Sequence, residues 1–186
     1  TSLDPAWQDY AQDAVDASTA IHPEKNSPDV SLVSVRATDG AIKAMLSGKN
    51  YNRDQYDLVW RGTRQVGSAF KPFTLVAAFE QGFPQGKVYS SKSPLCNLEG
   101  WRSASGCVSN AEGAGDGGYL DLWGATQNSV NVVFAQLALE VGPEHIVDVA
   151  NRMGITVGLD AVPSITLGVE EVPTMDMAAA FATLAP

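Results

Sequence analysis

The chain alternates between stretches with the apolar spacing of a helix and short runs typical of strands. Apolar residues recur at helical spacing after an Asp-Pro pair typical of a helix N-cap and first turn, which predicts a helix over residues 5–20. Two short apolar runs at 30–35 and 41–46 flank a Thr-Asp-Gly turn signal at 38–40. This arrangement predicts an antiparallel β-hairpin.

The rest of the chain is predicted to be mostly helical. Residues 68–80 are apolar almost all round, which is typical of a buried helix. Helical spacing also covers residues 119–125, 131–141, 143–153 and 174–184. Residues 49–63 and 84–118 have no clear period and are predicted to be irregular, and a loop as long as the second is usually functional or wrongly assigned. Helices dominate, and with one hairpin visible the sheet is incomplete.

The charge balance excludes one class of partner. The chain has 186 residues, with 12 Lys and Arg against 21 Asp and Glu and a net charge of −9. Nucleic-acid binders gain most of their affinity from clustered cationic side chains, so no nucleic acid is expected as a partner. No apolar stretch approaches the roughly 18 residues of a membrane span, and the first residues lack the pattern of a signal peptide. A membrane connection is expected only through an anchor on a longer parent chain.

Two cysteines, Cys96 and Cys107, lie in a stretch rich in Ser, Gly and Asn, outside any Cys-X-X-Cys pair. A zinc site needs about four ligands, and the two histidines, His22 and His145, are remote in sequence, so no metal and no other cofactor is expected. A bond between the cysteines would close a short loop and imply an oxidising, extracytoplasmic setting. The alternative is two unpaired thiols.

The first candidate for chemistry is the segment Ser68-Ala69-Phe70-Lys71-Pro72. Side chains three residues apart on a helix share a face, so the Lys71 amine can reach the Ser68 hydroxyl. The ring of Pro72 is tolerated only in a first turn, which places Ser68 at the helix N-terminus, where N–H groups favour a developing oxyanion. A serine nucleophile needs a base, and a lysine desolvated by the apolar residues that follow can act as one. Taken alone, the motif also fits a helix N-cap followed by a surface lysine.

The second candidate is Ser129-Val130-Asn131, between two predicted helical segments. A hydroxyl and a carboxamide on one short turn can face a common cleft. The hydroxyl can relay a proton, and the carboxamide can hold an amide of a peptide-like substrate. A helix N-cap is the simpler interpretation of these residues when they are taken alone.

Taken together, these segments resemble a known family. Residues 64–73 are similar to the nucleophile segment of penicillin-binding proteins, in particular the transpeptidase domain of the large bifunctional (class A) members, with Val66 where that segment usually has proline. The opening eight residues, the hairpin and residues 166–178 resemble other parts of the same domain. The resemblance implies an α/β (α+β) fold of the penicillin-recognising serine transpeptidase and β-lactamase type. In that fold, a helical subdomain accompanies the first hairpin of a central antiparallel sheet.

The resemblance also implies a role for each candidate residue. Ser68 is the nucleophile that becomes acylated, and Lys71 is its general base. Ser129 is a proton relay, and Asn131 binds an amide of the substrate. The pair Glu170-Glu171 does not resemble the deacylating glutamate of class A β-lactamases, because the Leu-Asn of that motif does not follow it. We expect surface or structural roles for this pair.

The third signature of the family, Lys-Thr/Ser-Gly on an inner strand, is absent from this sequence, and Lys92-Ser93-Pro94 only approaches it. In the family that strand follows the helix predicted at 174–184. We therefore expect residues 1–186 to be the amino-terminal part of a single transpeptidase domain, active only with the carboxy-terminal remainder of that domain as its partner.

The implied function is that of a serine D,D-transpeptidase in cell-wall synthesis. Such an enzyme cross-links peptidoglycan stem peptides through an acyl-enzyme on Ser68, and β-lactam antibiotics acylate the same serine. Two alternatives stay open: a D,D-carboxypeptidase that uses water as the acceptor, and a non-catalytic wall-binding member of the fold. The expected location is extracytoplasmic, on the outer face of the bacterial cytoplasmic membrane.

Overall fold

The computed structural model describes residues 1–20, 30–48, 55–111, 114 and 117–185. The chain forms two compact units, one of Thr1–Arg64, Met153–Val157 and Val172–Pro186, the other of Gln65–Arg152 and Gly158–Glu171. We call them the hairpin unit and the helical unit. The chain leaves the hairpin unit within strand β3 (Thr63–Gln65) and returns to it for the last time within strand β8 (Glu171–Pro173).

The hairpin unit is built on the predicted β-hairpin. Strand β1 (Ser31–Arg36) pairs antiparallel with strand β2 (Ala41–Ser47), from Ser31 opposite Ser47 to Arg36 opposite Ala41. An ion pair between Arg36 and Asp39 closes the turn. Gly40 completes it with a φ of +70°, which residues with a side chain rarely adopt. The predicted hairpin is confirmed, with both strands within one residue of the expected bounds.

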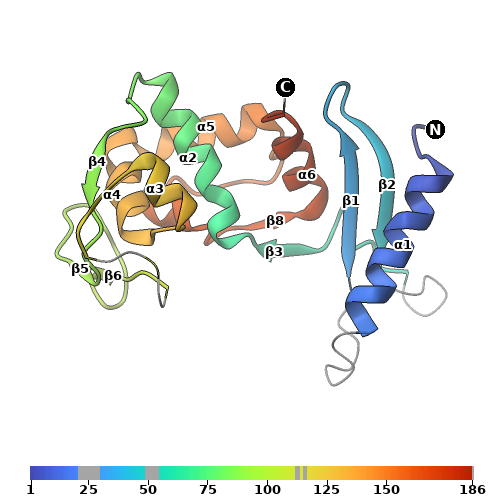
Figure 1. Ribbon diagram of the computed structural model, residues 1–186, viewed down its shortest axis with the longest axis horizontal. Coiled ribbons are helices and arrows are strands. Elements are labelled where there is room, and N and C mark those ends of the chain that lie inside the picture. Colours follow the sequence, from blue (N-terminus) through green and yellow to red (C-terminus); the bar gives the residue numbers. More distant parts are fainter. Residues whose placement is uncertain (21–29, 49–54, 112–113, 115–116, 186) are drawn as a thin grey trace. The chain divides into compact units, whose positions relative to one another are not determined.

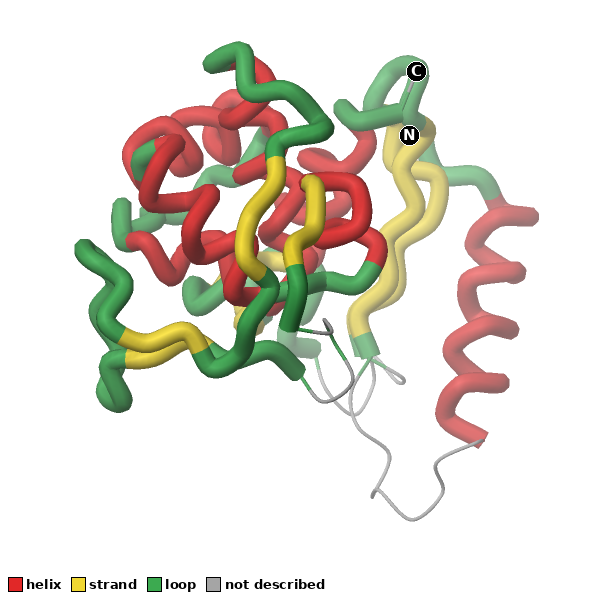
Figure 2. The backbone as a smooth tube through the Cα atoms, turned by 60° about the vertical axis from the view of Figure 1, so that its left-hand side comes forward, coloured by secondary structure: helices red, strands yellow, loops and turns green. Residues whose placement is uncertain are grey.

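Two helices pack on this hairpin. Helix α1 (Pro5–Ala20) packs against β2, and helix α6 (Thr174–Ala182) packs against β1. The side-chain amide of Gln8 bonds to β2 much as a neighbouring strand does: Nε2 donates to the Met45 carbonyl at 2.9 Å, and Oε1 accepts from the Met45 N–H at 3.0 Å. Figures 1 and 2 show α1 beside the two long strands. Both helices lie where the apolar spacing predicts them.

Helix α4 (Asn131–Val141) forms the centre of the helical unit. Seven of its 11 residues are buried, as the all-round apolar pattern of this segment predicts. Helix α2 (Lys71–Glu80), helix α3 (Leu122–Gln127) and the 3-10 turn η2 (Pro163–Leu167) pack around it. Helix α5 (Pro143–Met153) follows after Gly142, whose φ is +90°. Helices α4 and α5 are confirmed at their predicted bounds (Figure 1).

Part of the stretch 84–118, predicted to be irregular, forms short strands. Strand β4 (Val88–Ser90) pairs with strand β7 (Tyr119–Asp121), and strand β5 (Leu95–Cys96) pairs with strand β6 (Cys107–Val108). Strands of two or three residues are too short to display the alternation from which strands are predicted. The prediction of an irregular stretch over residues 84–118 was therefore wrong at β4, β5 and β6.

The prediction of a helix from residue 119 was wrong at its start. Residues 119–121 form β7, and helix α3 begins at Leu122 after Asp121, whose Oδ1 accepts from the Gly124 N–H at 2.8 Å. This is a side-chain N-cap, which ends the strand and begins the helix at one residue. The partner strand β4 lies far earlier in the chain, so local spacing contains no sign of the pairing.

Candidate active site

Ser68 lies on a tight turn immediately before helix α2. The 3-10 turn η1 (Gly67–Phe70) leads directly into α2, so the predicted helix over 68–80 becomes α-helical only from Lys71. Pro72 occupies the first turn of α2, where its missing N–H leaves no helical hydrogen bond unmade. One turn separates Ser68 and Lys71 on the same face, and the Lys71 Nζ donates to the Ser68 Oγ at 2.9 Å.

A contact between two glycines fixes the backbone just before Ser68. The Gly67 N–H donates to the Gly168 carbonyl at 3.1 Å, and the two residues have φ values of +57° and +66°. A Cβ atom at residue 168 would lie 2.1 Å from the Gly67 carbonyl oxygen. Only glycine fits at residue 168, because any side chain there would collide with the backbone of Gly67.

The second motif lies on a sharp turn between helices α3 and α4. Ser129 has a φ of +52°, which is uncommon for a residue with a side chain. Next to it, Val130 is fully buried, and its N–H donates to the Ala125 carbonyl at 2.9 Å. With Val130 in the core, Ser129 and Asn131 on either side of it both reach Lys71.

Lys71 joins the two motifs. Its Nζ lies 2.9 Å from the Ser129 Oγ, 2.7 Å from the Ser129 carbonyl oxygen and 2.8 Å from the Asn131 Oδ1, in addition to the Ser68 Oγ. An ammonium group has three N–H donors for these four oxygens, whereas a neutral amine has two donors and a lone pair that accepts from a hydroxyl. The geometry therefore suits a proton that passes between Lys71 and either serine.

The surroundings of Lys71 favour its neutral form. The residue is 3% exposed, and burial lowers its pKa from 10.5 to about 8. The fully buried rings of Phe70 and Phe73 lie 4.7 Å apart beside this segment of the chain and belong to its apolar surroundings. In the opposite direction, the Phe134 ring centroid lies 5.3 Å from Nζ, a cation–π contact that favours the charged form. A pKa near 8 leaves about a tenth of the lysine neutral at pH 7. The site thus contains an amine that can accept a proton at neutral pH.

Asn131 is held at both ends of its carboxamide. The Oδ1 accepts from Lys71, and the Nδ2 donates to the Ser109 carbonyl at 3.0 Å. These two bonds set which way the amide faces. One of the two N–H groups on Nδ2 is occupied by Ser109, and the other is left to donate elsewhere.

The four residues singled out from the sequence therefore lie together, although they come from two separate motifs. Ser68 and Lys71 come from the start of α2, and Ser129 and Asn131 come from the start of α4. The cluster combines a hydroxyl, a buried amine, a second hydroxyl on the same amine and an oriented carboxamide. Such a set can perform acyl transfer through a serine ester.

One known protein family matches the part of the chain that contains this cluster. The family described as "Penicillin binding protein transpeptidase domain" matches residues 30–164, a range that includes all four clustered residues. This chain belongs to the penicillin-binding protein transpeptidase family. The resemblance that its motifs carry is confirmed.

Relatives of this transpeptidase-family chain match it along its whole length. It is 32% identical over 203 residues to penicillin-binding protein 1A of Mycobacterium tuberculosis, and 30% identical to the protein of the same name from Mycolicibacterium smegmatis. All of this chain is covered in both cases, against 23% and 24% of the relatives. The chain thus spans about a quarter of the length of these relatives.

Solved structures share the transpeptidase fold of the chain. The structure of PonA1 from Mycobacterium tuberculosis in complex with penicillin V is 30% identical with a TM-score of 0.78, and the match covers 99% of this chain and 50% of that one. The imipenem acyl-enzyme complex of penicillin-binding protein A from the same organism gives a TM-score of 0.80 at 21% identity, over 99% of this chain and 51% of that one. The second match supports the fold alone.

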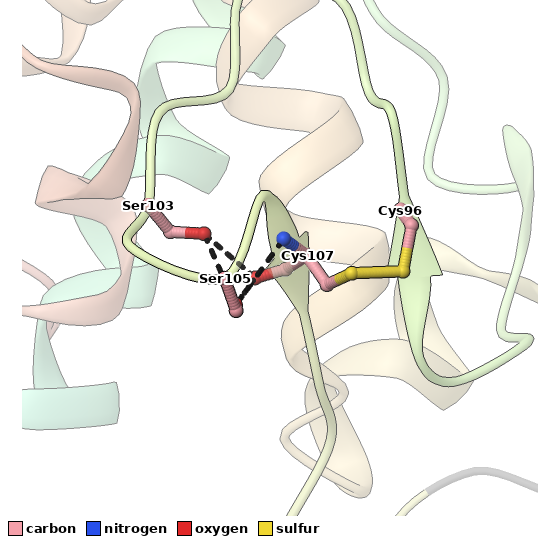
Figure 3. Close-up of a disulfide and its surroundings, with 4 residues drawn as sticks. All are labelled: Cys96, Ser103, Ser105 and Cys107. Carbon is pink, nitrogen blue, oxygen red and sulfur yellow. Dashed lines mark hydrogen bonds between the residues drawn. A yellow bond between two sulfur atoms is a disulfide. The ribbon is translucent and has the colours of Figure 1, made fainter.

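The transpeptidase-family chain also contains a disulfide just before Ser109, the residue whose carbonyl bonds to Asn131. Cys96 and Cys107 are bonded across the β5–β6 ribbon, and the Cys107 carbonyl accepts from the hydroxyls of Ser103 and Ser105 at 2.9 and 3.2 Å (Figure 3). Of the two states that the sequence leaves open, the structure has the bonded pair. Two residues beyond Cys107, the Ser109 carbonyl holds the Asn131 amide.

Other residues considered from the sequence lie elsewhere. The Nδ1 of His145 lies 3.0 Å from a backbone carbonyl one turn earlier, Glu171 is exposed in β8, and His22 is outside the described residues. In the described part of the chain, no three His, Cys, Asp or Glu side chains are grouped as metal ligands. Within the same residues, no helix has the length and apolar character that a membrane crossing requires.

Three residues at the site were not predicted from the sequence. Phe134 follows Asn131 by three positions, so a helix beginning at Asn131 places both on one face, a signal that was present in the spacing. The contact between Gly168 and Gly67 and that between Ser109 and Asn131 join distant segments. Local pattern contains no sign of such contacts.

Proposed function

We propose that this chain carries the acylation site of a serine D,D-transpeptidase that cross-links peptidoglycan stem peptides. The observation that supports it most is the position of Lys71, a buried amine whose Nζ lies 2.9 Å from both the Ser68 Oγ and the Ser129 Oγ. A serine with such a base can act as a nucleophile, and a second hydroxyl on the same amine can deliver the proton to a leaving group.

Acylation begins with the neutral amine. Lys71 takes the Ser68 hydroxyl proton while the Oγ attacks the carbonyl carbon of the penultimate D-Ala of a stem pentapeptide. The tetrahedral intermediate then breaks the bond to the terminal D-Ala, whose amine takes a proton from the Ser129 Oγ. Ser129 recovers its proton from the Lys71 ammonium. The products are an ester at Ser68 and free D-Ala, and Lys71 is neutral again.

The ester is resolved by an amine of a neighbouring stem peptide. This amine attacks the ester carbonyl, the new amide forms the cross-link, and the proton that the amine loses restores the Ser68 hydroxyl. During both steps, the free N–H of the Asn131 carboxamide binds an amide of the substrate. A β-lactam presents a strained amide in the same place, so ring opening leaves a penicilloyl ester on Ser68.

We also propose that residues 1–186 are the amino-terminal part of one transpeptidase domain. The match over 99% of this chain but half of the PonA1 chain supports this division. The carboxy-terminal remainder then supplies the Lys-Thr/Ser-Gly strand, with the second oxyanion N–H and the contact to the substrate carboxylate. The substrate and the disulfide both fit an extracytoplasmic location, with the membrane reached through an anchor of the parent chain.

Intact-mass spectrometry with benzylpenicillin tests the nucleophile, using the native protein that contains this sequence. The wild type is expected to gain one penicilloyl group on the peptide that contains Ser68. Ser68→Ala is expected to gain none, and the matched control Ser105→Ala, at an exposed serine of the same unit, is expected to gain one. A stable adduct on Ser68→Ala would contradict the assignment.

Product analysis with a stem pentapeptide distinguishes the transpeptidase from its alternatives. In the presence of an acceptor amine, a cross-linked product supports the transpeptidase. Tetrapeptide and D-Ala alone, whatever the acceptor, indicate a D,D-carboxypeptidase. Binding of wall fragments without covalent capture of benzylpenicillin indicates a non-catalytic member of the fold.

A further inference from the structure

Helix α4, which begins with Asn131, has no capping side chain of its own. Its N-cap residue is Val130, and no side chain at that position bonds to the first turn. The first N–H groups of a helix lack partners within the helix and must be satisfied from outside it. The residue that opens α4 is therefore held in place by something other than local sequence.

Asn110 supplies the missing cap from a distant part of the chain. Its Oδ1 accepts from the Val132 N–H at 3.0 Å, although 22 positions separate the two residues. A carboxamide oxygen on an N–H of the first turn is the bond that an asparagine N-cap ordinarily makes to its own helix. Here the same bond is made from the segment that follows β6.

The Asn110 side chain is itself fixed at its other end. The Nδ2 donates to the carbonyl of Ser91 at 3.3 Å, and the backbone N–H donates to the Ser93 Oγ at 2.9 Å. Ser91 is fully buried. The asparagine thus bridges a buried point of the helical unit and the start of α4, so its oxygen has little freedom to move away from Val132.

The residue before Asn110 acts on the same short stretch of α4. The Ser109 carbonyl accepts from the Asn131 Nδ2, and the Asn131 Oδ1 accepts from Lys71. Residues 109 and 110 therefore bond to the first two residues of α4. A chain of contacts runs from Asn110 through the start of α4 to the amine at the candidate site.

We propose that Asn110 is a positioning residue for acylation: its carboxamide caps α4 at Val132 and so holds Asn131 in reach of Lys71. This inference rests on the proposed function, because its effect is on the acylation of Ser68. Asn110 acts through Asn131. Loss of the cap lets the start of α4 shift, and a displacement of about 1 Å in a supporting contact can cost on the order of 100-fold in rate.

The test is the kinetics of labelling by a fluorescent penicillin, with the native protein that contains this sequence. The amplitude of labelling at saturation counts the folded, competent molecules, and the rate constant at saturating penicillin reports acylation in each of them. Asn110→Ala is expected to label to full amplitude with a rate constant about 10- to 100-fold lower. Asn110→Asp, whose carboxylate still accepts from the Val132 N–H but cannot donate to the Ser91 carbonyl, is expected to recover part of the rate. The matched control Asn151→Ala, at an exposed asparagine of α5, is expected to label like the wild type.

Each outcome decides the matter. An unchanged rate constant in Asn110→Ala, or a lower amplitude with an unchanged rate constant, refutes the positioning role, since the second result is that of a purely structural residue. An Asn110→Asp variant as slow as Asn110→Ala refutes the cap alone as the cause, since this variant keeps the acceptor for the Val132 N–H and lacks only the bond to Ser91. If Asn110→Ala yields no folded protein, Asn110→Ser replaces it, because its shorter side chain leaves the Val132 N–H without this acceptor. Failure of the wild type to label, or labelling of Ser68→Ala, refutes the proposed function and with it this inference.

Discussion

The hairpin unit and the helical unit obtain their order in different ways. In the hairpin unit, α1, β1 and β2 follow one another along the chain, and a short turn with the Arg36–Asp39 ion pair joins the strands. In the helical unit, the bonds from Lys71 to Ser129 and Asn131 span 58 and 60 positions. The β1–β2 hairpin is encoded nearby in sequence, whereas the bonds between Lys71 and the second motif exist only after distant helices have packed.

The two units also differ in how deeply their elements are buried. Nearly all residues of β1 and β2 are half-buried, whereas α4 buries most of its length in the core of its unit. A reacting group set on a fully packed helix is held more tightly than one on a half-exposed strand. The candidate chemistry therefore lies where the side chains are packed most tightly.

The largest effect is expected at Lys71, where a substitution should lower the acylation rate without lowering the thermal stability. Lys71→Met removes the proposed base, and the rate of penicillin acylation is expected to fall about 1,000-fold, within the range general bases contribute. The thermal midpoint is expected to stay level or rise, because a buried amine is replaced by an apolar chain of similar length. Fluorescent-penicillin kinetics and thermal denaturation measure the two quantities.

The matched variant in the hairpin unit is Gln8→Ala, which removes the two side-chain bonds to Met45. It is expected to lower the free energy of unfolding by about 1–2 kcal/mol and to leave the acylation rate within about twofold. The contrast between the units fails if Gln8→Ala slows acylation as strongly as Lys71→Met.

A pair of glycine substitutions compares the units at matched backbone conformation. Gly168 and Gly40 have φ values of +66° and +70°, so alanine costs about 1–2 kcal/mol of strain at either position. At residue 168 the new Cβ also meets the Gly67 backbone at 2.1 Å, whereas at residue 40 it meets nothing within 4 Å. Gly168→Ala is therefore expected to lose about 3 kcal/mol or more of unfolding free energy and to slow acylation.

Urea denaturation and acylation kinetics measure both glycine variants. Gly40→Ala is expected to lose only the strain and to acylate normally. Equal losses of stability in the two variants would show that the close approach of Gly67 and Gly168 contributes nothing.

The dependence of acylation on pH tests Lys71 without any substitution. Because burial lowers the pKa of Lys71 to about 8, the neutral base is a minority at pH 6 and dominates above pH 8. The acylation rate is expected to rise about tenfold from pH 6 to 7 and about fivefold from pH 7 to 8, and to level off above about pH 9. A rate that is flat between pH 6 and 8 would contradict Lys71 as the base.

The lowered pKa of Lys71 also makes the free energy of unfolding depend on pH. The unfolded lysine binds its proton up to about pH 10.5, whereas the folded one loses it near 8, so the penalty of burying this lysine is complete below pH 8. This contribution of Lys71 therefore becomes less unfavourable between pH 8 and 10.5. Comparing Lys71→Met with the wild type across this range isolates it from the other groups that titrate.

Much of the fold follows from local pattern, and the strands that were not predicted share one cause. Helices α1, α4, α5 and α6 and the β1–β2 hairpin lie where periodicity and turn chemistry predict them, because each buries a face that its own spacing defines. Strands β4 to β7 were missed because they are two or three residues long and pair with segments that local spacing does not reveal. At residues 119–121 that pairing overrides a pattern that also suits a helix.

The reactive groups are specified by short stretches of sequence: a serine and a lysine three positions apart, a proline that restricts them to a first turn, and a second motif with a hydroxyl and a carboxamide. Three features arise only when the chain folds: Lys71 bonds to both motifs, Phe134 lies over its amine, and Asn110 caps the helix that begins with Asn131. The reason is physical. Spacing along the chain specifies which side chains share a helix face, whereas a lowered pKa and a remote cap depend on desolvation and on contacts that form only when separate helices pack together.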